Sequence, residues 1–155
     1  MQRRSLLIAL AAWPASAAFA HHGWSSFDQG RAIYLEGIAR KVAWRNPHVE
    51  FDLEVAADLK VPPDLARRPV PAQAAAVDGA RLMASARTPN RKDKVWRIEL
   101  APLTRMDAWK VTPIRDGERV AVVGFTFAEE KGDPILRVEY LLVGNQTYGL
   151  RSGPA

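Results

Sequence analysis

Residues 48–55 read HVEFDLEV, and this stretch decides the fold class of the chain. Its apolar and polar side chains alternate without a break: Val49, Phe51, Leu53 and Val55 form one set, and His48, Glu50, Asp52 and Glu54 the other. Successive side chains of a strand point to opposite faces of a sheet. The pattern therefore predicts an antiparallel β-strand with one buried face and one solvent face.

Further strands are predicted on both sides of this stretch. Their ranges are residues 31–44, with a bulge or bend after Gly37, and residues 95–100, 119–127 and 135–143. Residues 102–109 predict a short helix, because proline is tolerated in the first helical turn. Five short strands with a helix between the third and fourth predict a mainly β fold, a small five-stranded antiparallel OB-like barrel. An open sandwich and an irregular β-meander are the structural alternatives.

A long insertion separates the second and third strands. Residues 57–94 are rich in alanine and arginine, are interrupted by five prolines and contain almost no aromatic residues. This composition predicts a partly disordered insertion with one short helix near residues 72–84. A loop of this length in a small domain is either functional or mobile.

The first 20 residues have the plan of a cleavable signal peptide. A basic start at Arg3 and Arg4 is followed by an apolar run and then by small residues. Cleavage after Ala20 would leave His21 as the first residue, and cleavage after Ala17 is the competing choice. We predict a signal peptide at 1–20 and a single domain at 21–155, located in the periplasm or secreted. The two arginines suit the twin-arginine route as well as ordinary secretion.

The charge and the composition exclude several classes of protein. Removing residues 1–20 takes away two arginines and no acidic residue, which lowers the net charge from +5 to +3. This is too mild for a nucleic-acid-binding surface. The chain has no cysteine, so its fold depends on a packed core and it offers no thiolate ligands. No second long apolar segment follows the signal, so we expect no stable membrane insertion. No serine or cysteine nucleophile and no phosphate-binding loop is recognisable, so the sequence gives no support for hydrolytic or nucleotide chemistry.

The three histidines are the one group of side chains in the sequence that suggests a metal-binding site. His21 and His22 are adjacent at the predicted new terminus, and His48 follows Asn46-Pro47. A first residue His21 offers both its α-amine and a ring nitrogen, and an all-nitrogen site favours Cu(II), then Ni(II) or Zn(II). The plainer interpretation is that His21 and His22 are solvated and that His48 supports a turn. The acidic residues of 48–55 could in the same way hold a hard cation or simply face solvent.

Several short motifs together resemble a known family. They are HHGW at 21–24 with Phe27-Asp28, LEG at 35–37, WRNPH at 44–48, WRIEL at 96–100, Trp109 and DGERV at 116–120. They resemble the secreted bacterial domain-of-unknown-function family 6152. The resemblance implies export and a small β-barrel-like domain, and it implies no known activity. The insertion at 57–94 and Phe125 depart from the family pattern.

These observations lead to one main functional hypothesis and two alternatives. The main hypothesis is an exported, non-catalytic metal-binding protein that acts as a copper carrier, buffer or accessory factor, with His21, His22 and His48 as ligands. The first alternative is an envelope β-barrel interaction module that binds a protein, peptide or glycan partner, with 57–94 as a contact segment. A copper-dependent oxidative enzyme is the second. The aromatic residues Trp24, Phe27, Trp44, Trp96 and Trp109 could line a ligand groove, but we expect them in the core. The oligomeric state stays open.

Overall fold

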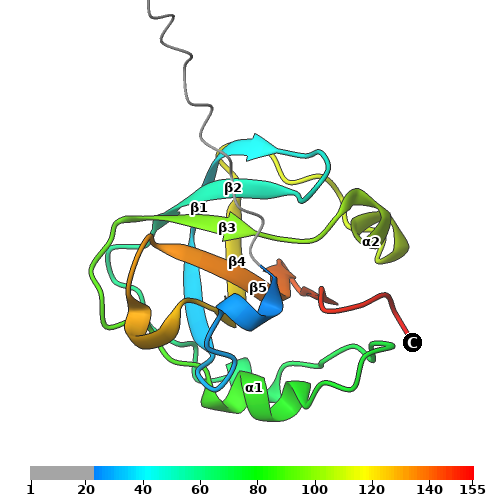
Figure 1. Cartoon of the computed structure of the whole chain (residues 1–155), viewed down its shortest axis with the longest axis horizontal. Helices are drawn as coiled ribbons and strands as arrows, with labels where there is room; N and C mark the ends of the chain where they lie inside the picture. The colour runs from blue at the N-terminus through cyan, green and yellow to red at the C-terminus, as the bar shows by residue number, and fades with distance from the viewer. Residues whose placement is uncertain (1–22) are drawn as a thin grey trace, which may run out of the picture.

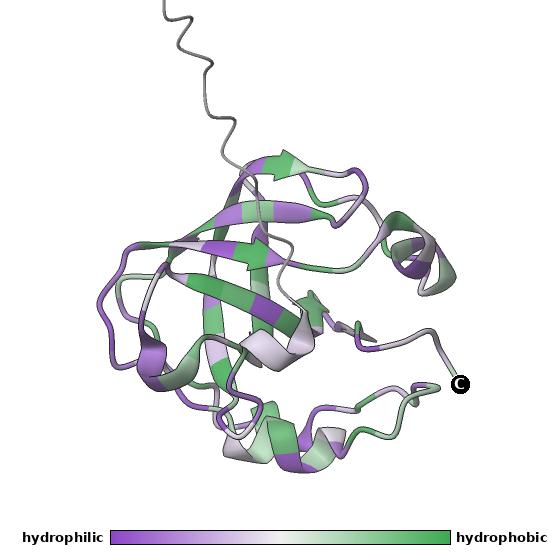
Figure 2. Ribbon diagram, in the orientation of Figure 1, coloured by the Kyte–Doolittle hydropathy of each residue, from purple (hydrophilic) through white to green (hydrophobic). Residues whose placement is uncertain are grey.

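The computed structural model describes residues 23–155, so the predicted signal peptide, His21 and His22 lie outside the described residues. Five strands curl into a closed barrel (Figure 1). They are β1 (Ile33–Ala43), β2 (Glu50–Val55), β3 (Val95–Glu99), β4 (Arg119–Phe125) and β5 (Ile135–Val143). Figure 2 shows the alternation of apolar and polar residues along β2 that the sequence indicated.

The barrel closes through one parallel pair of strands. β1 pairs with β2 and β4, β2 pairs with β3, and β4 pairs with β5, all antiparallel, whereas β3 and β5 run parallel. The OB-like barrel is thus confirmed, but the prediction that every pair is antiparallel is wrong. The reason is geometric: strand direction cannot alternate all the way around a ring with an odd number of members.

Two elements complete the sheet and close one end of the barrel. The short strand β6 (Gln146–Gly149), which the sequence did not indicate, pairs with the second half of β5, beyond the part that pairs with β3. Helix α2 (Leu103–Ala108) lies between β3 and β4 as predicted, and its fully buried Met106 packs into the barrel core. The described part of the chain thus has the element order expected of an OB-type barrel.

Strand β1 bends later than predicted. The register shift lies between Arg40 and Ala43, where Lys41 has a φ of 50°. Gly37, where we expected the bend, is instead a point of close approach, because a Cβ there would lie 2.0 Å from the carbonyl oxygen of Glu54. A glycine in a strand can therefore indicate that two backbones approach closely, and it need not indicate a bulge.

The core has two parts, one inside the barrel and one outside it. The inner part includes the fully buried Trp96, and Trp44 and Trp109 pack against it. The outer part lies between the barrel wall and the segments that cover it. Its buried members are Phe27, Ala32, Tyr34, Leu65, Met83, Ala86, Val123, Phe125, Tyr140 and Leu142, with Trp24 packed against them. The expected core position holds for Phe27 and Trp96, whereas Trp24, Trp44 and Trp109 are partly buried at the edge of the core.

The insertion is part of this outer core. The segment 57–94 contains the 3-10 turn η2 (Leu65–Arg67) and helix α1 (Gly79–Ser85), which is shorter than the predicted helix near 72–84. Gln73 and Pro154 form an isolated β-bridge, so the insertion also lies beside the C-terminal residues. The structure shows a packed cover where the composition indicated partial disorder. No helix among residues 23–155 has the length and apolarity to cross a membrane.

Candidate functional site

Trp24 holds the first described residues against the barrel wall through contacts with two arginines. Trp24 opens the 3-10 turn η1 (Trp24–Ser26), and its ring lies 3.7 Å from the Cζ atom of Arg151 and 5.1 Å from that of Arg137. The ring also meets Phe125 edge-on, with a centroid distance of 6.4 Å. Cation–π contacts of this kind are worth roughly 0.5–2 kcal/mol each. Trp24 therefore anchors the chain immediately after the predicted histidine pair.

Arg137 is the least satisfied side chain of this region. It lies on β5 with only 6% of its side chain exposed, and its Nη1 atom is 3.8 Å from Oε2 of Glu99, beyond hydrogen-bonding distance. Within residues 23–155 its Nε and Nη1 atoms are buried without a hydrogen-bond partner. Burial lowers the pKa of the Arg137 guanidinium. A buried donor left unpaired costs about 1–3 kcal/mol, and more when it is charged.

His48 contacts the same guanidinium. It lies in the loop between β1 and β2, just after the cis Asn46-Pro47 peptide bond, and its Nε2 atom is 3.4 Å from Nη2 of Arg137. Because a guanidinium only donates hydrogen bonds, His48 Nε2 is the acceptor in this contact. His48 and Trp24 thus share Arg137 as a neighbour, although 24 positions separate them in the sequence.

A buried ion pair fixes Arg151 over Trp24. Glu139 is fully buried, and its Oε2 atom accepts from Nε and Nη2 of Arg151 at 2.8 and 2.7 Å. Arg151 also donates to Oε1 of Gln29 at 2.7 Å, and Gln73 of the insertion donates to Oε1 of Glu139 at 3.1 Å. The N-terminal turn, the insertion, β5 and the C-terminal segment therefore meet at one place.

Sequence reasoning did not find Arg137, Glu139 or Arg151. The first two occupy polar positions of β5, which a two-residue period assigns to the solvent face. They are buried because η1 and the insertion cover that face. The one signal in the sequence is that the opposite charges stand two positions apart on the same face of the strand.

The predicted metal ligands fall on both sides of the described boundary. His48 is described, whereas His21 and His22 lie outside the described residues. From Gly23 onward, no three His, Cys, Asp or Glu side chains are grouped so that they could hold a metal ion.

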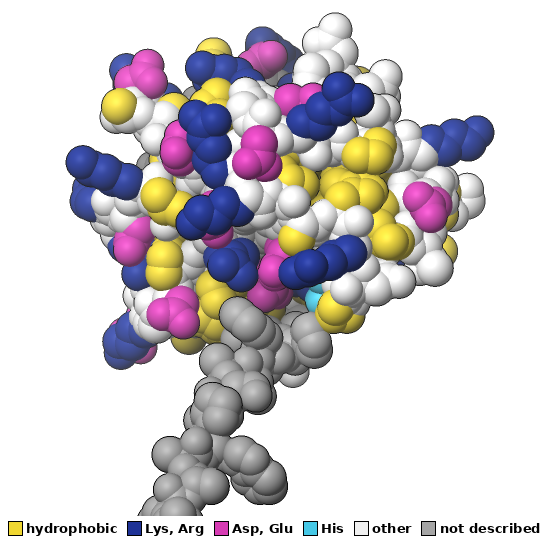
Figure 3. Space-filling view, turned by 90° about the horizontal axis from the view of Figure 1, so that it is seen from above, with side chains coloured by type: hydrophobic (Ala, Val, Ile, Leu, Met, Phe, Trp, Pro, Cys, Tyr) yellow, Lys and Arg dark blue, Asp and Glu magenta, His cyan; other side chains and the backbone are white. Residues whose placement is uncertain are grey.

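The acidic residues of β2, Glu50, Asp52 and Glu54, form ion pairs with arginines. Arg97 approaches Asp52 at 3.1 Å and Glu50 at 3.5 Å, and Arg40 approaches Glu54 at 3.0 Å. Figure 3 shows one face of the molecule, on which basic and acidic side chains are interspersed. These acidic residues have the character of a solvent-facing strand surface, which is the plainer interpretation of their pattern.

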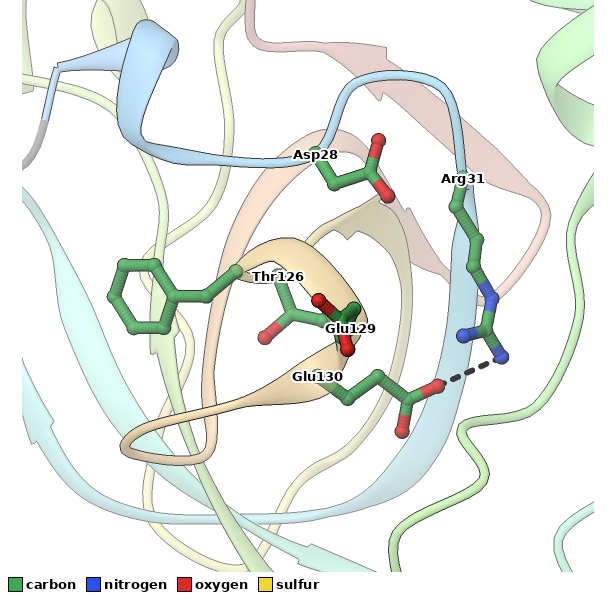
Figure 4. A pocket seen from close by; sticks show the side chains of 6 residues that line it. Asp28, Arg31, Thr126, Glu129 and Glu130 are labelled. Carbon is green, nitrogen blue, oxygen red and sulfur yellow. Dashed lines mark ion pairs between the residues drawn. The ribbon is translucent and has the colours of Figure 1, made fainter.

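A small cavity lies just beyond the C-terminal end of β4. Its volume is about 10 Å³, and it is lined by Asp28, Arg31, Thr126, Phe127, Glu129 and Glu130 (Figure 4). This is room for about one water molecule. Glu130, whose φ is 55°, forms an ion pair with Arg31 at 2.7 Å and accepts from the backbone N–H groups of Asn90 and Arg91. The cavity therefore belongs to a loop anchor, and its volume is too small for a ligand larger than water.

Comparison with known proteins gives one match. No curated protein and no solved structure matches the chain. The match is to a protein-family model and covers residues 9–60, a range that contains His21, His22 and the loop that carries His48. The resemblance inferred from the motifs is confirmed, because residues 9–60 of the chain match the model of the Family of unknown function (DUF6152).

Proposed function

We propose that this chain is an exported, non-catalytic protein that binds one Cu(II) ion at its mature amino terminus. Cleavage after Ala20 would leave His21 with a free α-amine beside its imidazole. These two nitrogens chelate the metal, His22 adds a third, and His48 is a further ligand within reach. The protein would serve as a carrier, buffer or accessory factor for copper in the periplasm or outside the cell.

The observation that supports this proposal is the position of His48. All three histidines of the chain fall in two motifs, and His48 contacts the guanidinium that lies against Trp24. Trp24 follows His21 by three residues, and three residues of extended chain reach about 10 Å. The described residue Trp24 of the first motif and His48 of the second thus have Arg137 as a common neighbour, which supports the proposal.

The donor set favours copper over other metals. Nitrogen ligands without thiolate or thioether suit Cu(II) in a square-planar or tetragonal arrangement, and Ni(II) and Zn(II) follow. The amine and ring of one residue form a chelate that needs no other part of the fold. The terminal pair is therefore the main element of the proposed site.

Arg137 limits the contribution of His48. A neutral imidazole has one lone pair, and at His48 Nε2 this lone pair faces an N–H group of Arg137. A metal ion at Nε2 would have to displace that contact and lie beside a guanidinium charge. We therefore expect the His48→Ala substitution to weaken copper binding less than His21→Ala does.

The test compares two starting points of the same chain. Protein beginning at His21 and protein beginning at Ala18 contain the same three histidines, but only the first has the amine on a histidine. We expect the His21 form to bind one Cu(II), with quenching of tryptophan fluorescence, and the Ala18 form to bind about tenfold more weakly or worse. Equal affinities of the two forms, or no binding above nonspecific levels, would reject the proposal.

The closed OB-type barrel favours a second candidate function, an envelope interaction module. Such barrels bind ligands through the β2–β3 face and the adjoining loops. Here that face carries Glu50, Asp52 and Arg97, whereas the insertion is largely used to cover the opposite wall. The candidate contact surface is thus the β2–β3 face. Partner binding that survives His21→Ala and is lost on Arg97→Glu would favour this function over copper binding.

A further inference from the structure

Arg137 has more hydrogen-bonding capacity than residues 23–155 use. Its side chain is more than nine-tenths buried, yet its Nε and Nη1 atoms have no hydrogen-bond partner there. Buried polar groups in folded proteins are almost always paired, so each exception calls for an explanation. A ligand that accepts hydrogen bonds is one such explanation.

The charged groups around Arg137 indicate the sign of the charge on that ligand. Within residues 23–155, Arg137 and Arg151 lie beside two carboxylates, those of Glu99 and Glu139. Glu139 is committed to Arg151 at 2.7 Å, and Glu99 stays 3.8 Å from Arg137. Among residues 23–155, the Arg137 guanidinium therefore has no carboxylate within hydrogen-bonding distance, which suits an anionic guest.

We propose that Arg137 binds a small monocarboxylate, with Trp24 as the movable cover of the site. A carboxylate matches the planar guanidinium and accepts charge-assisted hydrogen bonds from it. A single negative charge neutralises the Arg137 guanidinium, whereas a dianion such as hydrogen phosphate would leave a buried negative excess. This site uses no histidine as a ligand, but it shares Arg137 with the His48 contact, so it is tested on metal-free protein.

Access to Arg137 depends on Trp24. The tryptophan is only partly buried, and the turn η1 that carries it contains no buried residue. Its contacts with Arg137 and Arg151 are of the cation–π type, which is weaker than a charge-assisted hydrogen bond to a carboxylate. A carboxylate at Arg137 would therefore replace a weak ring contact by a stronger charge-assisted hydrogen bond.

The test is an acetate titration of metal-free protein that begins at His21, followed by nuclear magnetic resonance. We expect saturable shifts of the Arg137 Nε–H and Trp24 indole N–H signals, at constant ionic strength and with chloride as the reference ion. Equal shifts with chloride would indicate ionic-strength effects only and would overturn the proposal. Tighter binding of phosphate than of acetate would overturn the assignment of a monocarboxylate.

Two variants complete the experiment. Arg137→Lys keeps the charge and loses the planar fork, and we expect it to weaken acetate binding at least tenfold while it keeps a dispersed spectrum. Arg119→Lys, at an exposed position of β4, is the matched control and should bind as the wild type does. An Arg137→Lys protein that folds and binds acetate equally well would overturn the proposal.

A further arm identifies the source of the carboxylate. An N-acetylated dipeptide with a free C-terminus is compared with acetate. Tighter binding of the peptide identifies a chain end as the ligand, and tighter binding of acetate identifies a free organic acid. Both results support a carboxylate site at Arg137.

Discussion

At the scale of single residues, carboxylates hold the irregular parts of the barrel in place. Asp116 accepts hydrogen bonds from the backbone N–H groups of Lys41 and Val42, at 3.0 and 2.9 Å, where β1 bends. Glu130 does the same for residues 90–91 of the insertion. Both residues compensate for backbone donors that the strand ladder does not use.

Asp116 makes the stability of the protein depend on pH. The two backbone N–H groups hold the pKa of its carboxyl below the usual range. A folded-state pKa below the unfolded value, about 3.9, contributes stability above that pH, and the contribution is lost as the pH falls through the folded-state pKa. We expect Asp116→Asn to be less stable than the wild type at pH 7, with a difference that shrinks toward pH 3. Urea unfolding across this range tests it, with Asp58→Asn at an exposed position as the control. A difference that does not change with pH would contradict the assignment.

Glu130 and its neighbour Glu129 form a matched pair for a second prediction. Both have a positive φ, 55° and 56°, but their side chains are 5% and 75% exposed. Glu130→Ala leaves Arg31 and two backbone donors without their partner, so we expect a loss of about 3 kcal/mol in the free energy of unfolding. Glu129→Ala should change it by less than about 0.5 kcal/mol. Equal losses for the two variants in denaturant unfolding would contradict the anchoring role of the Glu130 carboxylate.

At the scale of elements, period-two patterns identified the strands because one face of each lies on the barrel core. Strand β6 was not predicted, since four residues are too few to establish a period. The insertion was misjudged for a different reason. Its scattered apolar residues, such as Leu65 and Met83, gain a partner only from the outer barrel wall, which local sequence does not specify.

The close approach of β1 and β2 gives a prediction about these elements. A Cβ at Gly37 would meet the backbone of Glu54 at 2.0 Å, and backbone atoms cannot move aside as a flexible side chain can. We expect Gly37→Ala to lower the free energy of unfolding by about 3 kcal/mol. Gly153→Ala is the control, because a Cβ there has nothing within 4 Å. A thermal or urea unfolding curve that is the same for both variants would contradict this packing.

At the scale of the whole molecule, the candidate site lies where segments distant in the sequence meet. The N-terminal turn brings Trp24, the β1–β2 loop brings His48, β5 brings Arg137 and the C-terminal segment brings Arg151. The sequence indicated His48 because histidine is rare in this chain. It did not indicate the arginines, because a charged residue in an alternating strand is usually solvated, and only the assembled fold buries it.

The central claim is that the mature protein begins with a metal-chelating histidine. The most direct test is the intact mass and metal content of protein exported by a host of its own type. The account predicts a chain that begins at His21 and carries one copper ion, which is lost on His21→Ala. A chain that begins at Ala18, or one without stoichiometric copper, nickel or zinc, would contradict it.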